Sequence, residues 1–326
     1  MKVVQQSQYG PADVLEVVEH DTPAAVDGRV RVQVQARALN PADIGTRAGA
    51  FAAMTPGLTF PAVLGWDFAG VLLDDATVGG SVGTLAAGTR VAGFVPWFGE
   101  ALGAGSYTEV LVVDPTWVAP VPDALSTAEA AVLGMNAVTG AHAADMVADL
   151  LGVAGGSDAL AGRTVLVTGA SGPVGAAAVL TLVGRGARVL ATGSRGDDES
   201  VAALGAEVLP RTDAAGIAAA AREAADGGVD AVFNAGLASH ELLAAVRDGG
   251  VFVSATRGYM PTAERGVTVD GVHVEPDPER LVALLDEAVA GRLPVRVAKE
   301  VPLEDAAAAH ALVEAGGVRG KVVLVS

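Results

Sequence analysis

The feature that most constrains the fold is a glycine-rich segment in mid-chain, Thr164–Gly175, with the sequence TVLVTGASGPVG. An apolar strand here runs into a tight turn that opens a helix. Gly169 and Gly172 allow the turn and a close backbone approach, and Gly175 lets the helix pack on the sheet. The start of such a helix offers N–H donors and a positive dipole end to a diphosphate. The segment predicts dinucleotide binding, and a glycine-rich helix start without a ligand is the alternative.

A regular alternation of strands and helices follows this segment. The strands are short apolar runs, as in a parallel sheet that is covered on both faces. The pattern therefore predicts a doubly wound α/β domain. The expected strands are residues 164–167, 188–191, 207–209, 230–233 and 251–254, and the expected helices are 174–184, 199–204, 214–225 and 240–246.

The first third of the chain is instead rich in short strands separated by Gly and Pro, which is typical of a barrel or sandwich. Arg29–Ala38 alternates apolar and polar residues, as a half-buried strand does. Ser126-Thr-Ala-Glu129 is a capping-box pattern that predicts a helix to about Ala144. The other strands expected in this part are 3–6, 14–18, 69–73, 90–94, 107–113 and 117–120.

The chain after Tyr259 changes pattern again. We expect a strand at 267–274, helices at 278–290 and 303–315, and a closing strand at 321–326 that returns to the first domain. The 326 residues suit roughly two domains. The expected domains are 1–124 together with 268–326, and 125–267.

Composition excludes several classes of function. The chain has no cysteine, so disulfides, iron–sulfur clusters, Cys-type zinc sites and a cysteine nucleophile are ruled out. The net charge of −17 opposes nucleic acid and anionic membranes as partners. The sequence shows no apolar run long enough for a membrane span and no signal-peptide pattern at its N-terminus. We therefore expect a soluble, cytoplasmic protein.

The end of the second predicted strand of the α/β domain bears on the choice of cofactor. An acidic residue there would favour NAD, but the sequence gives Ser194 and Arg195, which suit the 2′-phosphate of NADP. Asp197 and Asp198 come slightly too late for the ribose position. The pattern favours NADPH over NADH, and a solvated loop charge is the alternative for Arg195.

Short-chain dehydrogenases share such a turn but place it near the N-terminus and carry a Tyr-x-x-x-Lys motif. Here the turn is in mid-chain, and none of the tyrosines has a lysine four positions later. The residues at that spacing from Tyr9, Tyr107 and Tyr259 are Asp13, Leu111 and Ala263. That class is excluded.

Several motifs give the chain its resemblance to a known family. It resembles the medium-chain dehydrogenase/reductase superfamily, and within it the zinc-free quinone oxidoreductase branch that includes ζ-crystallin. The motifs are ALNPAD at 38–43, FPAVLGWD at 60–67, GSYTE at 105–109, the turn at 168–175 and GVRGKVVL at 317–324. The resemblance covers nearly the whole chain and implies a Rossmann-type cofactor domain plus a GroES-like catalytic domain.

The resemblance also bears on metals and on substrate. Zinc-dependent relatives carry Cys near Asn40 and Gly-His-Glu where this chain has Gly65-Trp66-Asp67, so zinc independence is implied. Quinone reductases of the branch often carry tyrosines near Thr46 and Phe51. Neither tyrosine is present here, so the motifs do not specify a simple quinone.

The residues that the resemblance places at the cofactor occupy several strand ends. It puts Asn40 and Thr139 near the nicotinamide, the turn after the first strand at the diphosphate, and Ser194 and Arg195 at the 2′-phosphate. The turn residues at the diphosphate are Ser171, Gly172, Pro173 and Val174. The remaining positions are Asn234, Ala235, Gly236, Ser254, Ala255, Thr256, His273 and Val274. Plainer interpretations are that Asn40 caps a turn and that residues 234–236 form a strand-end turn.

Reduction also needs a proton. Asp43, Tyr107, Tyr259 and water are the candidates, and Asn40, Asp43 and Tyr259 form the expected catalytic set. Asp43 as a structural hydrogen-bonding residue and Tyr259 as a loop aromatic are the alternatives. The five histidines are scattered without metal spacing.

Trp97-Phe98-Gly99 lies in a glycine-rich stretch and suits either a lid over a planar substrate or an anchor for a long loop.

Together these features predict an NADPH-dependent reductase that transfers hydride to a quinone or an α,β-unsaturated carbonyl in a cleft between the domains. Alternatives are a tailoring enoyl or keto reductase acting on a natural-product (polyketide-like) intermediate, a ζ-crystallin-type NADPH-binding protein without turnover, and a scaffold that binds nothing. We expect a homodimer joined along the strand at 267–274.

Overall fold

The computed structural model describes residues 1–99, 101–153, 156–236, 240–256 and 260–326. The chain divides into two compact units. Unit 1 comprises residues 1–135, 275–289 and 295–326, and unit 2 comprises 136–274 and 290–294. The sequence-based boundaries stood at 124/125 and 267/268. Chain segments from both ends thus build unit 1.

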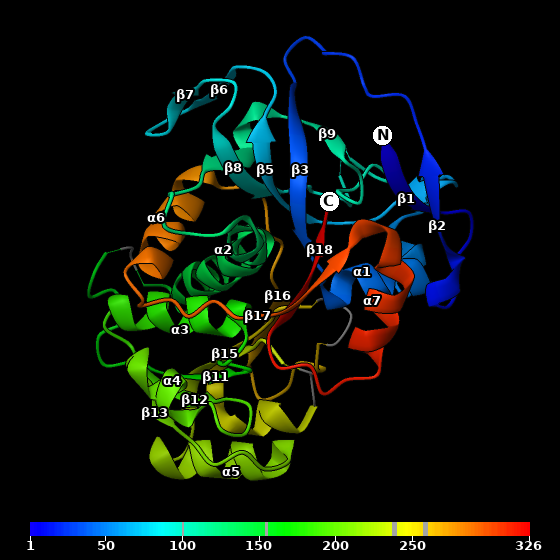
Figure 1. Ribbon diagram of the computed structural model, residues 1–326. Helices are drawn as coiled ribbons and strands as arrows, with labels where there is room; N and C mark the ends of the chain where they lie inside the picture. Colours follow the sequence, from blue (N-terminus) through cyan, green and yellow to red (C-terminus); the bar gives the residue numbers. More distant parts are fainter. Residues whose placement is uncertain (100, 154–155, 237–239, 257–259) are drawn as a thin grey trace. The chain divides into compact units, whose positions relative to one another are not determined.

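Unit 2 is organised around a six-stranded sheet whose neighbouring strands all pair in parallel (Figure 1). The order across the sheet is β13-β12-β11-β14-β15-β16. The first strand in the sequence, β11, is thus central, and later strands are added on both sides of it. This confirms the predicted α/β class. The strands are β11 (Thr164–Thr168), β12 (Arg188–Thr192), β13 (Glu207–Val208), β14 (Val229–Asn234), β15 (Val246–Ser254) and β16 (Thr268–Gly271).

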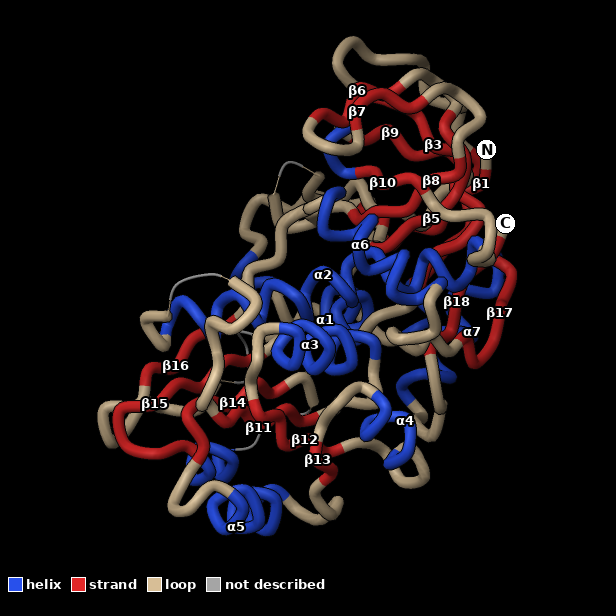
Figure 2. The backbone as a smooth tube through the Cα atoms, turned by 90° about the vertical axis from the view of Figure 1, so that its left-hand side faces the viewer, coloured by secondary structure: helices blue, strands red, loops and turns tan. Residues whose placement is uncertain are grey.

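Helices cover both faces of this sheet, with α3 and α5 on opposite sides (Figure 2). The helices are α3 (Pro173–Gly184), α4 (Asp198–Ala203) and α5 (Ala214–Ala224). The segment expected as a helix at 240–246 is a 3-10 helix, η4 (His240–Ala245). The central strands are apolar because both of their faces are buried: every residue of β14 is buried.

Small residues let the second half of α2 (Thr127–Leu150) approach α3 closely. A Cβ on Gly140 would lie 2.1 Å from the Val174 carbonyl oxygen and 2.8 Å from the Ala178 nitrogen. Real Cβ atoms do not come so near to backbone, so only glycine fits at this position.

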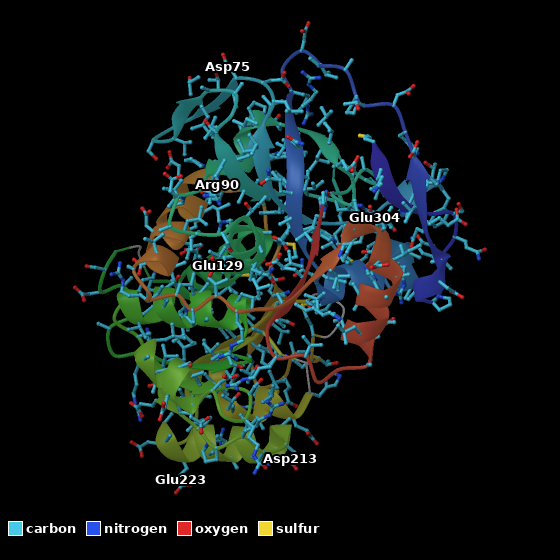
Figure 3. The ribbon with its side chains drawn as sticks, in the orientation of Figure 1. Asp75, Arg90, Glu129, Asp213, Glu223 and Glu304 are labelled. Carbon is cyan, nitrogen blue, oxygen red and sulfur yellow. The ribbon has the colours of Figure 1, made fainter. Side chains whose placement is uncertain are left out.

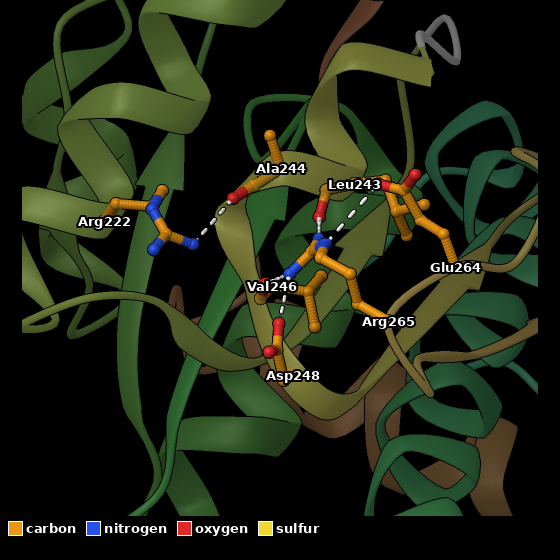
Figure 4. A network of polar contacts seen from close by, with 7 residues as sticks. All are labelled: Arg222, Leu243, Ala244, Val246, Asp248, Glu264 and Arg265. Atoms are coloured by element: carbon orange, nitrogen blue, oxygen red, sulfur yellow. Dashed lines mark hydrogen bonds and ion pairs between the residues drawn. The ribbon is translucent and has the colours of Figure 1, made fainter.

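Arg265 ties η4 to the strand that follows it (Figure 4). Its guanidinium donates to the carbonyls of Leu243 and Val246, each at 2.8 Å, and pairs with Asp248 at 2.9 Å. The carbonyls at the end of a helix lack intrahelical partners, so an arginine here satisfies them.

Unit 1 is built from a seven-stranded sheet, a three-stranded sheet and a two-stranded hairpin. The main sheet runs in the order β10-β8-β5-β3-β18-β17, and β9 also pairs with β3. Its strands are β3 (Val30–Ala38), β5 (Asp67–Leu72), β8 (Arg90–Phe94), β9 (Val110–Val113), β10 (Val118–Pro120), β17 (Val297–Pro302) and β18 (Lys321–Val325). The others are β1 (Lys2–Gln6), β2 (Leu15–Glu19), β4 (Ala62–Val63), β6 (Ala76–Gly79) and β7 (Gly83–Leu85).

The closing strand returns to the first part of the chain, as predicted. β18 pairs antiparallel with β3, with Leu324 opposite Arg37, and parallel with β17. β17 was not anticipated, because KE in the middle of VAKEVP interrupts its apolar pattern.

The helices of unit 1 are α1 (Pro41–Ala48), α6 (Pro278–Val289), α7 (Ala306–Glu314) and the first part of α2. The capping box that opens α2 is confirmed: the Ser126 N–H donates to Glu129 Oε2 at 2.9 Å, and the Glu129 N–H donates to Ser126 Oγ at 3.2 Å (Glu129 is labelled in Figure 3). α2 continues past the expected end near Ala144 to Leu150.

None of the helices in the described residues is both long enough and apolar enough to cross a membrane.

Candidate functional site

The glycine-rich turn of unit 2 joins β11 to α3 and has the predicted strand–turn–helix form. Gly169 adopts a left-handed conformation, with φ of 71°. A Cβ on Gly175 would lie 2.3 Å from the Gly169 carbonyl oxygen. Both positions therefore require glycine. Gly172, the N-cap of α3, has an ordinary φ of −86°, and a Cβ there would meet only one atom, at 3.5 Å. Its glycine is not needed for the turn itself.

Pro173 occupies the start of α3, where its fixed φ is tolerated and its missing N–H is not needed by the helix. Val174, the next residue, is partly buried. The start of α3 therefore keeps the remaining free N–H groups of a helix end, which suit an anionic group.

Ser171 connects the turn to the end of the next strand. Its Oγ accepts a hydrogen bond from the backbone N–H of Ser194 at 2.9 Å. The loop after β12, residues 193–197, is called the β12 loop below. Arg195 is exposed on this loop, Ser194 is partly buried, and Asp197 is 2% exposed. The structure therefore brings Ser171 and Ser194 together, and Arg195 follows Ser194 in the chain.

The carboxyl ends of β11 and β14 bring Thr168 and Asn234 together. The Thr168 hydroxyl donates to Asn234 Oδ1 at 2.5 Å, and the Gly236 N–H donates to the same oxygen at 3.3 Å. Asn234 Nδ2 is buried and has no hydrogen-bond partner in the described part of the chain. An unpartnered buried donor is costly. At the carboxyl edge of a parallel sheet it marks a place for a ligand's acceptor.

The neighbouring strand end is closed by local bonds. The Ser254 hydroxyl donates to the Thr256 carbonyl at 2.9 Å, and the Ala255 N–H donates to the Asn234 carbonyl at 3.0 Å. Thr139 lies on α2 and is 7% exposed. His273 and Val274 follow the end of β16. Tyr259 lies outside the described residues.

A polar cluster in unit 1 surrounds Asn40, the N-cap of α1. The Asn40 backbone N–H donates to Asp43 Oδ2 at 2.7 Å, and its Nδ2 donates to Asp67 Oδ2 at 2.5 Å. The ammonium of Lys321 donates to Asn40 Oδ1. The amide of Asn40 is thus fixed in orientation by a carboxylate on one side and a cation on the other. Asn40 is the residue before α1, which starts at Pro41.

Burial controls the ionisation of this cluster. Asp43 and Asp67 are both fully buried, and desolvation raises the pKa of each to about 7. Desolvation likewise lowers the pKa of Lys321. Both oxygens of Asp67 receive N–H donors, from Asn40 and Met135, whereas Asp43 Oδ1 has no partner among the described residues. Asp67 is therefore the better site for the negative charge, and Asp43 the better site for a proton.

A second buried network in unit 1 joins residues that sequence reasoning did not connect. Arg47 Nη1 donates to His310 Nδ1 at 3.2 Å, so the ring proton of neutral His310 is on Nε2, which lies 3.0 Å from the Tyr107 hydroxyl. Burial lowers the pKa of His310 to about 3 and raises the pKa of Tyr107. Tyr107 is 0% exposed. The network carries no local sequence signal, because Arg47 and His310 are 263 positions apart.

Four aromatic residues of unit 1, Phe51, Trp66, Trp97 and Phe98, form one cluster. Phe98 packs edge-on against Trp66, with ring centroids 4.8 Å apart, and against Phe51 at 5.5 Å. Trp97 is fully buried and donates from Nε1 to the Val63 carbonyl at 2.9 Å. Of the two interpretations of this loop, anchoring therefore applies to Trp97, while Phe98 is only partly buried.

No group of three or more His, Asp or Glu side chains in the described residues is arranged to hold a metal ion. Two features fit a dinucleotide. The first is the Gly169–Gly175 turn, which has no room for a Cβ atom at Gly175, and the second is the unpartnered donor of Asn234 in the described part of the chain.

Comparison with known proteins agrees with this geometry. Residues 26–123 match the family model of the alcohol dehydrogenase GroES-like domain, and residues 204–324 match that of the zinc-binding dehydrogenases. A crystal structure described as an NAD-dependent alcohol dehydrogenase is 31% identical, with a TM-score of 0.78 over 100% of both chains. The rat quinone oxidoreductase is 28% identical over 100% of this chain and 98% of its own length.

The spectinabilin polyketide synthase system protein NorB of Streptomyces orinoci is 33% identical over 91% of this chain. The chain spans 13% of the length of that relative. The two family models, the full-length structural match, and the parallel sheet of unit 2 identify a single superfamily. The chain belongs to the medium-chain dehydrogenase/reductase superfamily, and it is similar to the quinone oxidoreductases of that superfamily.

Proposed function

We propose that the protein is a zinc-independent, NADPH-dependent reductase that delivers hydride to a quinone or to a C=C bond conjugated with a carbonyl. The observation that carries the proposal is the Gly169–Gly175 turn, tied by Ser171 to a loop that presents Ser194 and Arg195. When bound, the nicotinamide cofactor supplies the hydride. The protein's part is binding, orientation and proton supply.

The roles of the unit 2 residues follow from their positions. The start of α3, at Gly172 and Val174, is proposed to hold the diphosphate, with donors from Val174 onward because the Gly172 N–H already donates to the Gly169 carbonyl at 3.1 Å. Arg195 and the Ser194 hydroxyl suit a 2′-phosphate. Asn234 Nδ2 offers a buried donor at the sheet edge. The other residues proposed to hold the cofactor are Asn40, Thr139, Ser171, Pro173, Ala235, Ser254, Ala255, Thr256, His273 and Val274.

The cluster around Asn40 supports a mechanism without zinc. The chain has no cysteine, and both Asp67 oxygens already receive N–H donors. Lys321 provides a positive charge from within the protein, and Asn40 is oriented between it and Asp67. We propose that Asn40 orients the reacting groups and that Asp43 stores a proton near neutral pH. Tyr259 remains a proposed donor from its sequence position.

Two substrate classes fit the unit 1 aromatic cluster of Trp66, Phe98 and Phe51, because aromatic faces pack on flat, apolar molecules. The full-length similarity to a quinone oxidoreductase supports a quinone. The similarity to a polyketide synthase component supports a second candidate, an enoyl or keto reductase acting on a polyketide-like intermediate.

The test begins with the cofactor. Thermal unfolding is measured with NADPH and NADH at equal concentration, since a ligand at 100 times its Kd adds about 2.7 kcal/mol of stability. We expect the larger shift with NADPH and a reduced shift in Arg195→Ala. NADPH oxidation is then followed with quinones, enones and thioester-linked enoyl substrates. Tight binding with no oxidation by any acceptor would support a non-catalytic NADPH-binding protein instead, and a shift with NADH alone would overturn the assignment of NADPH.

We also propose a cytoplasmic homodimer joined along β16. This strand is the last in the order of the unit 2 sheet, and an edge strand can continue a sheet into a second copy. The net charge of −17 disfavours nucleic acid and anionic membranes as partners. Light scattering that gives the mass of one chain would overturn the dimer.

A further inference from the structure

Arg211 lies in the segment that follows β13, and the motifs described above did not single it out. β13 pairs in parallel with β12, and the Leu209 N–H continues this pairing to the Ala191 carbonyl at 2.8 Å. Parallel neighbours end at the same edge of the sheet. Arg211 accordingly lies beside the β12 loop, where its Nη1 donates to the Gly193 carbonyl at 3.4 Å.

The charges at the two ends of this strand pair differ. At the amino ends, Arg188 of β12 pairs with Glu207 of β13 at 2.7 Å. At the carboxyl ends stand two exposed arginines, Arg195 and Arg211, and neither forms an ion pair with a described residue. In a chain with a net charge of −17, two unpaired cations at one loop make a local site for an anion.

Acidic residues also stand near this site. Asp197 is 2% exposed, and Asp198 and Glu199 are exposed in the first turn of α4. Asp213 caps α5 by accepting the Gly216 N–H at 2.8 Å (labelled in Figure 3). A guanidinium has five N–H donors, and the contact with Gly193 uses one of them. Arg211 is therefore held at the loop with most of its donors available.

We infer that Arg211 is a specificity-determining residue that, together with Arg195, binds a phosphomonoester dianion across the β12 loop. The ligand class is an adenosine 2′-phosphate, so this inference rests on the proposed function. A dianion favours two guanidinium groups over one, and planar forked donors match phosphate oxygens. A ribose 2′-hydroxyl gains nothing comparable from a second cation.

The experiment compares Arg211→Ala with Arg195→Ala and with Arg222→Ala as a matched control. Arg222 is also an arginine without an ion pair in the described residues, and it also donates to one backbone carbonyl, that of Ala244 at 3.1 Å (Figure 4). Calorimetry measures the Kd of NADPH, NADH, adenosine 2′-monophosphate and adenosine 5′-monophosphate for each variant. Melting temperature verifies folding, which an exposed substitution should preserve.

We expect Arg211→Ala to weaken NADPH and adenosine 2′-monophosphate about tenfold, leaving NADH and the 5′-monophosphate within about twofold. Arg211→Lys should restore part of the loss, and Arg222→Ala should change nothing. Unchanged NADPH binding in Arg211→Ala, or an equal loss for NADH, would overturn the inference and leave the proposed cofactor intact. If the wild-type protein binds adenosine 2′-monophosphate through both arginines but not NADPH, the proposed function fails and the anion site stands.

Discussion

The two units of the molecule place their buried polar groups differently. In unit 1, charged side chains lie in the interior: Arg37, Asp43 and Asp67 are 0% exposed. In unit 2, the sheet interior is apolar, and polar side chains such as Thr168, Asn234 and Ser254 are confined to the strand ends. Unit 2 thus keeps the polar side chains of its sheet near the strand ends, whereas unit 1 has buried charged groups in addition to its apolar clusters.

This difference teaches where each unit is sensitive. A buried charge needs its partners, because an uncompensated ion in the interior is expensive. The glycine turn of unit 2 is instead sensitive to any added side-chain atom, because its backbone segments pack too closely to admit one. Trp66, Trp97 and Trp117 are the three tryptophans of the chain, and all belong to unit 1. Tryptophan fluorescence therefore reports on unit 1 alone, so the two sensitivities can be measured separately.

The largest effect should come from Lys321→Met. This change removes the ammonium that donates a hydrogen bond to Asn40 Oδ1 and that offsets the negative charge of Asp67. Lys321 is mostly buried, and loss of one member of a buried charge group costs about 3–5 kcal/mol, so we expect a loss of about that size. Urea unfolding followed by tryptophan fluorescence measures it. Lys2→Met, at an exposed pair with Glu304, is the control and should leave the midpoint unchanged; equal effects of both would remove the contrast between the units.

Gly175→Ala should come next and should act on the other unit. The added methyl would lie 2.3 Å from the Gly169 carbonyl oxygen, so the turn must open, at about 1–3 kcal/mol. Far-UV circular dichroism should show earlier unfolding, while the tryptophan transition stays in place. Gly184→Ala, at the end of α3 with nothing within 4 Å, is the matched control. A shifted tryptophan transition would contradict the separation of the units.

Asp43→Asn should change how unit 1 responds to pH. Burial raises the pKa of Asp43 to about 7, so between about pH 4 and 7 the native state holds a proton that the unfolded state has released. Asp43 therefore lowers stability as the pH rises through this window, and the asparagine variant should lose that component. We expect its stability relative to wild type to improve by about 2–3 kcal/mol from pH 5 to pH 8. Parallel pH profiles from urea unfolding would show that Asp43 does not carry the proton.

The smallest effect should come from Ser126→Ala, which removes the hydroxyl that caps α2. The expected loss is about 1 kcal/mol, read from tryptophan fluorescence. Ser81→Ala is the control, since Ser81 is exposed and its hydroxyl has no partner among the described residues. A loss above that of Lys321→Met would reverse the ranking of caps and buried charges in unit 1.

Features whose contacts lie close together in the sequence could be predicted from it, and features whose contacts lie far apart could not. The glycine turn and the capping box at Ser126 lie within a few neighbouring residues, so both were predicted. α1 was not predicted as a helix, because it is short and contains Gly45. The contact between Lys321 and Asn40 spans 281 positions. No local pattern marks such a contact.

The chemistry of unit 1 was the less predictable for the same reason. Asn40 and Asp43 were singled out by motif, but their shared cation and the Arg47–His310 network come from strands and helices far apart in sequence. Arg211 was missed because only the pairing of β13 with β12 brings it to the β12 loop. Parallel pairing between separate strands leaves no local signature.

The return of β18 to β3 has a consequence for biosynthesis. During synthesis the first strands of unit 1 emerge before unit 2, yet β3 can pair with β18 only after residues 321–325 have been made. Nearly all of unit 2, residues 136–274, is translated in between. Asp67 and Asn40 emerge long before the ammonium of Lys321 reaches them. Of the two units, unit 1 thus begins before unit 2 and is completed after it. While unit 2 is being translated, Asn40 and Asp67 lack the ammonium of Lys321.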